Sequence, residues 1–398
     1  MISKKIKDVM QSGSAIRAMF EEGKKLADLY GKENVYDFSL GNPSVPTPKS
    51  VNEAIVKIAK DADTLTLHGY MLNSGFESAR KAIADNLNSR YGTDFAFKNI
   101  IMTVGAAGGL NVALKSIINE ADEVIVFAPY FGEYNNYIAN VGGRVVVVPP
   151  NPPTFGPNLE AMKEAISVRT KAVIINSPNN PTGVIYGENT LKELGKILKE
   201  QSEIKGEAIY LISDEPYREL VYDGNQVPFL TKYYDNTIIG YSYSKSLSLP
   251  GERIGYLAIP DEAEDSENLI AACGVATRIL GFVNAPSLQQ LVIEKCIDEK
   301  ADVSAYDKNR KLLYNSLTEY GFECIKPQGA FYLFVKCPIE ESKFVAKAKE
   351  YNILLVSGKS FACEGYVRIA YCVSYDMIER SLPYFKKLAE DTIEKKEK

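Results

Sequence analysis

The chain is poor in histidine, tryptophan and paired cysteine. Its 398 residues include a single histidine and no tryptophan. Histidine-rich metal sites, relays of two histidines and stacking on an indole ring are therefore excluded. All six cysteines fall in the last third of the chain, without a CxxC pair or a regular spacing, which argues against a disulfide framework or a structural zinc and leaves no candidate metal ligands. Any chemistry must rest on Lys, Arg, Asp, Tyr or Cys.

Long apolar runs and an excess of positive charge are also missing. The first twenty residues lack the apolar core of a signal peptide, and no later stretch approaches the roughly 18 apolar residues of a membrane span. Forty-six basic residues against 51 acidic ones leave a formal charge of −5, which disfavours a nucleic-acid-binding surface. We expect a cytoplasmic protein that binds neither membrane nor nucleic acid. At about 150 residues per domain, the length predicts two or three domains.

Short runs rich in Val and Ile alternate with helical patterns in the first two thirds of the chain. The runs occupy residues 122–129, 144–150, 171–178, 207–214, 236–242 and 253–259. Such near-continuous apolar runs are typical of strands that are buried on both faces of a mostly parallel sheet. Helical spacing at 160–167 and 188–200 completes the alternation. We therefore predict a large α/β domain over residues 50–285, with a central sheet covered by helices.

The pattern changes after residue 285. Apolar runs at 330–336, 352–358 and 366–373 alternate with helical patterns at 341–350 and 375–390. This predicts a smaller α/β domain over residues 286–398, and we expect the N-terminal segment 1–49 to join it.

Polar residues follow four of the runs in the large domain. In open α/β sheets, ligands bind outside the carboxyl ends of the strands. Parallel strands would gather these residues at one edge of the sheet: Tyr130 and Phe131, Ser177 to Pro181, Asp214 with Glu215 and Tyr217, and Ser242, Ser244 and Lys245. Upstream, Gly105, Ala106 and Ala107 stand where a helix begins, and a helix N-terminus can bind a phosphate.

Each of these residues also has a simpler reading. Lys245 alone would be a solvated surface charge, and Asp214 could be a helix cap. Asn180 in NNPTG is a natural turn former, and Phe131 could belong to the core. Arg253 and Arg368, at or inside apolar strands, could form structural salt bridges. The order of the whole set carries more weight than any one member.

Eight segments in the same order resemble the class I/II, aspartate aminotransferase-like family of pyridoxal-phosphate-dependent enzymes with fold type I. They are GNPSVPTP (41–48), Tyr70, GAA (105–107), PYF (129–131), NSPNNPTG (176–183), DEPY (214–217), SYSKSLSLPGERIGY (242–256) and YVRIAY (366–371). The resemblance spans nearly the whole chain. It implies a large cofactor-binding domain and a small domain built from both chain ends.

The resemblance also implies the cofactor contacts. Lys245 would form the Schiff base with pyridoxal 5'-phosphate, and Asp214 would pair with the protonated ring nitrogen, which makes the ring an electron sink. The remaining contacts would be Tyr217 and Asn180 to the phenolate oxygen, Phe131 on the ring face, and Ser242, Ser244, Arg253 and the amides around Gly105, Ala106 and Ala107 to the phosphate. Tyr70 would reach the phosphate of a neighbouring subunit, which implies a homodimer.

For the substrate, the resemblance places the α-carboxylate on Arg368, with Gly41 and Asn180 assisting. The implied reaction moves an amino group from an L-amino acid to a 2-oxo acid with ping-pong kinetics, possibly as an aspartate aminotransferase. Arg278 is a candidate for binding a side-chain carboxylate, although its offset from Asn284 and Pro286 departs from the family pattern.

Two other functions remain open at this point. The same scaffold supports β-elimination by C–S lyases. Some transcription regulators carry an aminotransferase-like domain without enzymatic activity. That second alternative needs a DNA-binding extension, whereas only about 40 residues precede the GNP motif, and the isoelectric point is near 5.4.

Overall fold

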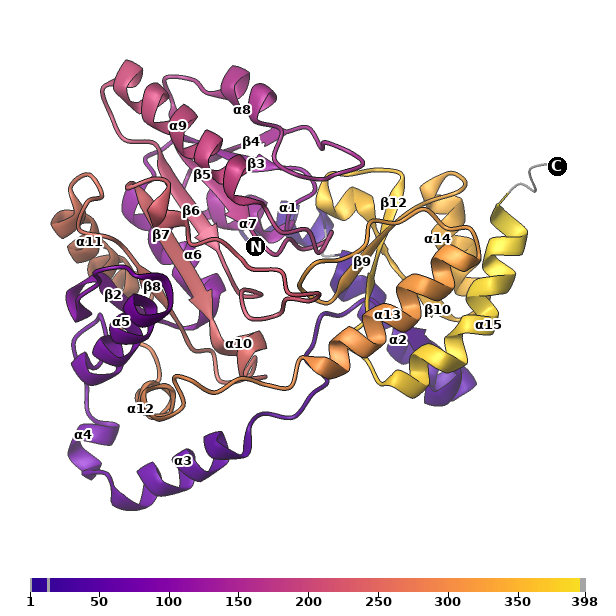
Figure 1. Ribbon diagram of the computed structural model, residues 1–398, viewed down its shortest axis with the longest axis horizontal. Coiled ribbons are helices and arrows are strands. Elements are labelled where there is room, and N and C mark those ends of the chain that lie inside the picture. The colour runs from indigo at the N-terminus through magenta and orange to yellow at the C-terminus, as the bar shows by residue number, and fades with distance from the viewer. Residues whose placement is uncertain (1, 13–14, 394–398) are drawn as a thin grey trace.

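The computed structural model describes residues 2–12 and 15–393. A large sheet with its helices forms one part of the molecule, and a smaller group of strands and helices lies beside it (Figure 1). Within the described residues, no helix is long and apolar enough to cross a membrane.

The large part is built on a seven-stranded sheet with the strand order β2-β8-β7-β6-β5-β3-β4. β8 is antiparallel to both of its neighbours, and the other neighbours are parallel. The strands are β2 (Ile100–Thr103), β3 (Glu123–Phe127), β4 (Arg144–Val148), β5 (Thr170–Asn176), β6 (Tyr210–Asp214), β7 (Thr237–Ser242) and β8 (Gly255–Ala258). All six predicted runs contain a strand, and the mostly parallel α/β sheet is confirmed. β2 was not predicted.

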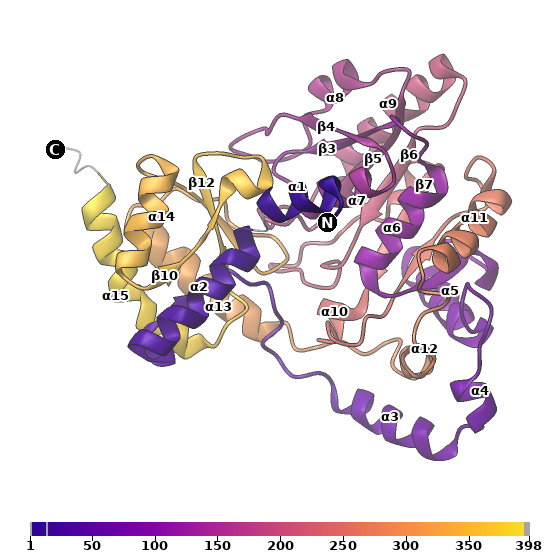
Figure 2. The ribbon, with the colours of Figure 1, turned by 180° about the vertical axis from the view of Figure 1, so that it is seen from behind.

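Helices cover both faces of this sheet, which explains why its strands are apolar at nearly every position. On β3, Val124 and Val126 pack into one core while Ile125 and Phe127 pack into the other. The first core lies under α6 (Gly105–Ile117), α7 (Glu133–Asn140) and α11 (Ser266–Ile279). The second lies under α3 (Lys49–Asp61), α5 (Glu77–Tyr91), α8 (Leu159–Ala165), α9 (Glu188–Lys205) and α12 (Ser287–Lys295). Figure 2 shows α6 and α11 together on one side of the sheet.

The smaller part has its own sheets and its own core. β11 (Val356–Ser357), β12 (Tyr366–Ala370) and β9 (Tyr332–Lys336) form an antiparallel sheet. β1 (Tyr36–Asp37) pairs in parallel with β10 (Ile353–Leu354), so both ends of the chain contribute. The accompanying helices are α2 (Ala15–Tyr30), α13 (Ser304–Glu319), α14 (Glu341–Glu350) and α15 (Tyr375–Thr392).

The remaining elements are short. They are α1 (Lys4–Ser12), α4 (Thr64–His68), α10 (Tyr243–Ser246) and the 3-10 helices Lys32–Asn34, Phe97–Asn99, Leu230–Lys232 and Gly358–Phe361. The domain boundaries at residues 49/50 and 285/286 stay a prediction. Helix α12, which follows residue 285, packs against α3 and α5 beside the large sheet.

The register of the large sheet and the helix that follows β7 bring four polar residues to one edge: Asn176, Asp214, Ser242 and Lys245. Asn176 at the end of β5 stands opposite Asp214 at the end of β6, and Asp214 stands opposite Gly240 on β7. β7 ends at Ser242 and leads directly into α10, which carries Lys245. The carboxyl ends of neighbouring parallel strands therefore converge, as the sequence predicts.

Candidate active site

A cavity of about 350 Å³ lies at this edge and is lined by residues from both parts of the molecule. The predicted residues in its lining are Gly41, Ala106, Ala107, Phe131, Asn180, Asp214, Tyr217, Ser242, Ser244, Lys245, Arg253 and Arg368. Gly105, the residue before Ala106, is not part of the lining. Tyr70 is 94% exposed and lies outside the lining.

Asp214 presents a buried carboxylate with one oxygen left unpaired. The Tyr134 hydroxyl donates a hydrogen bond of 2.6 Å to Asp214 Oδ2, whereas Oδ1 has no partner within the described chain. Burial raises the pKa of Asp214 to about 7, the Tyr134 hydrogen bond acts to lower it, and the charge of Glu215 acts to raise it. An orphaned buried oxygen is costly, and a cationic partner would remove that cost. The helix-cap reading of Asp214 does not apply, because β6 ends there without a following helix.

Lys245 ends inside the cavity instead of in solvent. Its Nζ donates a hydrogen bond of 2.9 Å to the Gly41 carbonyl oxygen and lies 5.3 Å from the centroid of the Phe331 ring. Desolvation lowers the pKa of Lys245 to about 8; Cys372 acts to raise it, and the charges of Arg253 and Arg368 act to lower it further. An amine of this kind is partly neutral near neutral pH and can act as a nucleophile or a base.

A set of hydrogen-bond donors at one end of the cavity suits a phosphate. Ser242 caps α10 by accepting a 3.1 Å hydrogen bond from the Ser244 amide, and the two hydroxyl oxygens lie 2.6 Å apart. Arg253 is bonded to the carbonyl oxygens of Pro250 and Val104, and no salt bridge engages it in the part of the chain that the structure describes. Together with the N-terminus of α6, these donors can hold a dianion.

Gly105 makes room for this arrangement. Its φ of +76° is a left-handed conformation, and a Cβ at this position would lie 2.8 Å from Arg253 Nη2. A side chain here would both strain the backbone and displace the guanidinium.

Arg368 is a buried guanidinium whose partners are all uncharged. It lies on β12 and is 1% exposed; Nη1 donates to Asn180 Oδ1 at 3.0 Å and Nη2 to the Ser39 carbonyl oxygen at 2.6 Å. Nε has no partner among residues 2–12 and 15–393. The rings of Tyr332 and Phe361 lie 4.4 and 4.9 Å from the guanidinium carbon. A structural salt bridge is absent from the described residues, so the charge is available to an incoming carboxylate.

The other predicted residues complete the walls of the cavity. The hydroxyls of Tyr217 and Tyr332 lie 2.9 Å apart, and the backbone N–H of Asn180 donates to Asn176 Oδ1 at 2.7 Å. Phe131 is half-buried and packs edge-to-face on Tyr134. The turn at Asn180 therefore also supplies a side chain to the cavity, where it meets Arg368.

Sequence reasoning missed several residues of the lining, including Glu133, Tyr137, Asn176 and Tyr332, as well as Tyr134 behind Asp214. The three-residue spacing of Tyr134 and Tyr137 on the helix after PYF could have placed both on one side. Asn176 ends a predicted strand, so the sheet register could have placed it beside Asp214. Arg278, in contrast, is exposed in the last turn of α11 and lies outside the cavity lining of its own chain.

Comparison with known proteins shows the family of this chain. Residues 33–383 match the model of the family described as aminotransferase class I and II. The chain belongs to this family. The aminotransferase is 30% identical to the aspartate aminotransferase of Thermotoga maritima, covering 96% of this chain and 97% of the relative. It is also 30% identical to the aspartate/prephenate aminotransferase of Thermus thermophilus, over 87% and 89% of the two chains.

Solved structures agree with this assignment. An amino transferase from Eubacterium rectale is 48% identical, with a TM-score of 0.96 over 99% of this aminotransferase and 100% of that chain. The aspartate aminotransferase of Thermus thermophilus with maleate is 26% identical, with a TM-score of 0.86 over 98% and 99%. The predicted family, fold type I and enzyme class are confirmed: the protein is a pyridoxal-phosphate-dependent aminotransferase.

The residues present fit this cofactor. The unpaired Asp214 Oδ1 suits the protonated ring nitrogen, and the donors around Arg253 suit the phosphate. Lys245 and the aromatic face of Phe131 line the space between them.

Proposed function

We propose that this aminotransferase transfers the amino group of an L-amino acid to a 2-oxo acid with Lys245 as the catalytic amine. The observation that carries the proposal is the shared cavity: the amine of lowered pKa and the buried Arg368, which has no carboxylate partner in the described structure, line the same space. One group is suited to move a proton and the other to hold an amino acid by its carboxylate.

The cofactor would be held by the residues already described. Asp214 would accept from the ring nitrogen, Tyr217 and Asn180 would bind the phenolate oxygen, and Phe131 would cover one ring face. Ser242, Ser244, Arg253 and the amides around Gly105, Ala106 and Ala107 would bind the phosphate. When bound, pyridoxal phosphate supplies an electron sink for the carbanion at the substrate Cα.

The substrate would be oriented by its carboxylate. Arg368 offers a guanidinium that two neutral acceptors already hold in place, with Asn180 beside it. Gly41 assists because it has no side chain: a Cβ there would lie 2.1 Å from the Tyr332 hydroxyl oxygen. With the carboxylate fixed, Lys245 Nζ would remove the Cα proton and return it at the cofactor carbon. Nζ must be neutral to do so, which its lowered pKa favours.

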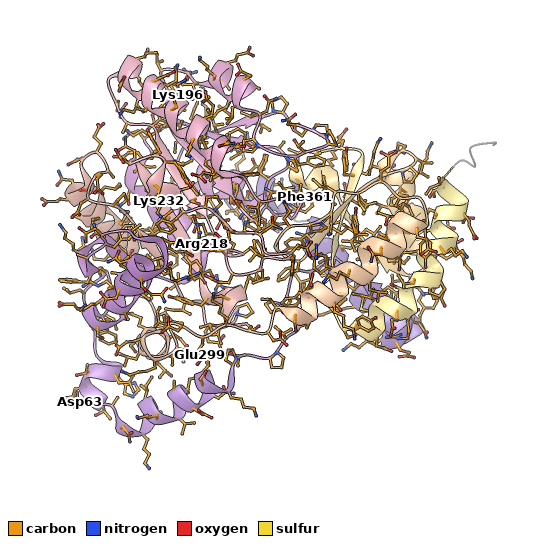
Figure 3. All side chains as sticks on the ribbon, in the orientation of Figure 1. Asp63, Lys196, Arg218, Lys232, Glu299 and Phe361 are labelled. Carbon is orange, nitrogen blue, oxygen red and sulfur yellow. The ribbon has the colours of Figure 1, made fainter. Side chains whose placement is uncertain are left out.

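We further propose that the enzyme works as a cytoplasmic homodimer with Tyr70 contributed to the neighbouring site. Tyr70 is exposed, as are Leu65 and Leu72 in the same segment and Val275, Ile279 and Phe282 in or just after α11. Asn73 Nδ2 donates to the Val283 carbonyl oxygen at 2.6 Å, which ties the Tyr70 segment to the end of α11. Figure 3 places Asp63, at the start of α4, on the outer edge of the molecule. An apolar surface of this kind is typical of a subunit interface.

The same hydrogen bond ties the Tyr70 segment to the residues that follow α11, and Arg278 lies in the last turn of that helix. We propose that the preferred donor is aspartate and that Arg278 binds its side-chain carboxylate. The names of the Thermotoga maritima and Thermus thermophilus relatives support the choice of substrate.

A panel of amino donors tests this function. Each donor is supplied with 2-oxoglutarate or pyruvate, and conversion of the cofactor to its amine form is followed spectroscopically. We expect conversion with aspartate and its reversal by either oxo acid. Release of pyruvate from cysteine-type substrates without any oxo acid would instead favour the C–S lyase, and inert donors throughout would favour the non-enzymatic regulator.

A further inference from the structure

Tyr134 is a buried residue behind the cavity with no assigned role. It lies in the first turn of α7 and is 1% exposed. Its hydroxyl supplies the one side-chain hydrogen bond that Asp214 receives from the described residues, at 2.6 Å to Oδ2. The other carboxylate oxygen, Oδ1, has no hydrogen-bond partner among residues 2–12 and 15–393.

Packing fixes the direction in which this hydroxyl points. The Tyr134 ring is stacked on Tyr130 with centroids 6.2 Å apart, and Phe131 meets it edge-to-face at 5.7 Å. Tyr134 therefore joins the residue proposed to cover the cofactor ring to the residue proposed to pair with the ring nitrogen. A ring held on both sides places its hydroxyl at a single acceptor.

The electrostatics of the hydrogen bond between Tyr134 and Asp214 determine which group is the donor. Burial, followed by the charge of Asp214, raises the pKa of Tyr134 well above 10, so the hydroxyl keeps its proton and remains a donor. The same hydrogen bond acts against the burial that raises the pKa of Asp214. Without Tyr134, the carboxyl group would more readily hold its own proton and lose its attraction for a cationic ring nitrogen.

We propose that Tyr134 is a positioning residue that keeps Asp214 anionic and leaves Oδ1 as the oxygen that faces the cofactor's ring nitrogen. The inference rests on the proposed function. Tyr134 touches neither cofactor nor substrate in this scheme and acts only through Asp214. Its effect must therefore depend on the presence of the ring nitrogen.

Equilibrium binding to cofactor-free protein tests this dependence. The two ligands are pyridoxal phosphate and 1-deazapyridoxal phosphate, in which a CH group replaces the ring nitrogen. Tyr134→Phe should weaken binding of pyridoxal phosphate about tenfold, as expected for loss of a hydrogen bond to a charged group. Binding of the deaza analogue should be the same in the variant and the wild type. Equal weakening of both ligands would indicate a merely structural role and overturn the proposal, as would unchanged binding of pyridoxal phosphate.

Two further variants sharpen the result. Tyr130→Phe removes a hydroxyl that bonds Asn135 at 2.9 Å and not Asp214, so it should leave the affinities for both ligands unchanged. In an Asp214→Ala background, Tyr134→Phe should have no further effect, and an additive loss would overturn the proposal. If the wild type binds neither ligand, the proposed function fails and this inference fails with it. If the wild type binds pyridoxal phosphate and Tyr134→Phe binds it equally well, only this inference fails.

Discussion

At the scale of single residues, the site is a set of charges that lack their usual partners. Within the part of the chain that the structure describes, one oxygen of Asp214 has no partner and Arg368 has only neutral acceptors, while Lys245 is desolvated. The sequence could identify these side chains because each follows or interrupts an apolar strand. It could have placed Tyr134 and Tyr137 on one side of a helix from their spacing, but it could not show the hydrogen bond from Tyr134 to Asp214.

The lowered pKa of Lys245 predicts how cofactor uptake depends on pH. An amine with an ordinary pKa of 10.5 is almost fully protonated at pH 8, whereas one with a pKa of about 8 is half neutral there. We expect the rate at which cofactor-free protein develops the yellow absorption with added pyridoxal phosphate to rise with pH, with a midpoint near 8. Lys245→Ala should lose the absorption and the transferase activity together. Lys196→Ala, on the exposed side of α9, is the control. A midpoint above 10, or activity retained in Lys245→Ala, would contradict the assignment.

Arg278 allows a separate prediction about substrate choice. If it binds a side-chain carboxylate, Arg278→Ala should lower kcat/KM for aspartate by about 10- to 100-fold through loss of a charge-assisted contact. Turnover of alanine, which has no such carboxylate, should be unchanged and serves as the internal control. Steady-state measurements of kcat/KM with both donors test this prediction. If kcat/KM is unchanged for both donors, Arg278 does not bind the substrate.

At the scale of elements, strand ends and helix starts determine where the chemistry lies. The long Val/Ile runs made β3 to β7 predictable, since strands covered on both faces need apolar residues at every position. β2 was missed although it is no shorter than β8, which was predicted; each has four residues. The start of α6 was located from its small residues, but only the structure shows why they are small: Arg253 lies directly against Gly105.

Gly105→Ala tests this account of the phosphate end. A left-handed alanine costs about 1–2 kcal/mol of folding free energy, and its Cβ would also displace the Arg253 guanidinium. We expect lower thermal stability and weaker binding of pyridoxal phosphate. Gly92→Ala is the matched control, because Gly92 also has a left-handed φ, of +64°, but a Cβ there would meet nothing within 4 Å. That variant should lose similar stability while its cofactor affinity stays unchanged. Identical affinities in the two variants would contradict the role given to Gly105.

At the scale of the whole molecule, one chain brings most of the predicted residues into one cavity but leaves Tyr70 exposed and outside the lining of that cavity. The resemblance to the family could suggest a role for Tyr70, because it rests on the position of this residue in the sequence alone. No sequence pattern could show which surfaces of two subunits meet, since that depends on the shape of the folded chain.

Mixed dimers test the placement of Tyr70. We expect the Tyr70→Ala protein and the Lys245→Ala protein each to have little activity. The two proteins are dissociated into subunits, mixed in equal amounts and allowed to reassociate. If Tyr70 serves the neighbouring subunit, a mixed dimer has one site with both native residues. Random mixing should then restore about a quarter of wild-type activity. If Tyr70 served its own chain, no site in the mixture would be intact and no activity would return. Each variant carried alone through the same treatment provides the baseline.

The pairing of β1 with β10 also bears on the order in which this protein matures at the ribosome. Ser39 and Gly41, just after β1, offer their carbonyl oxygens to Arg368 and Lys245, yet the strand that anchors them is translated more than 300 residues later. The sheet of the large part can form while synthesis continues. The first forty residues, however, cannot take up their final positions until the last fifty have been synthesised, because β1 pairs with β10. A nascent chain in which β10 has not yet been made would accordingly have no catalytic activity.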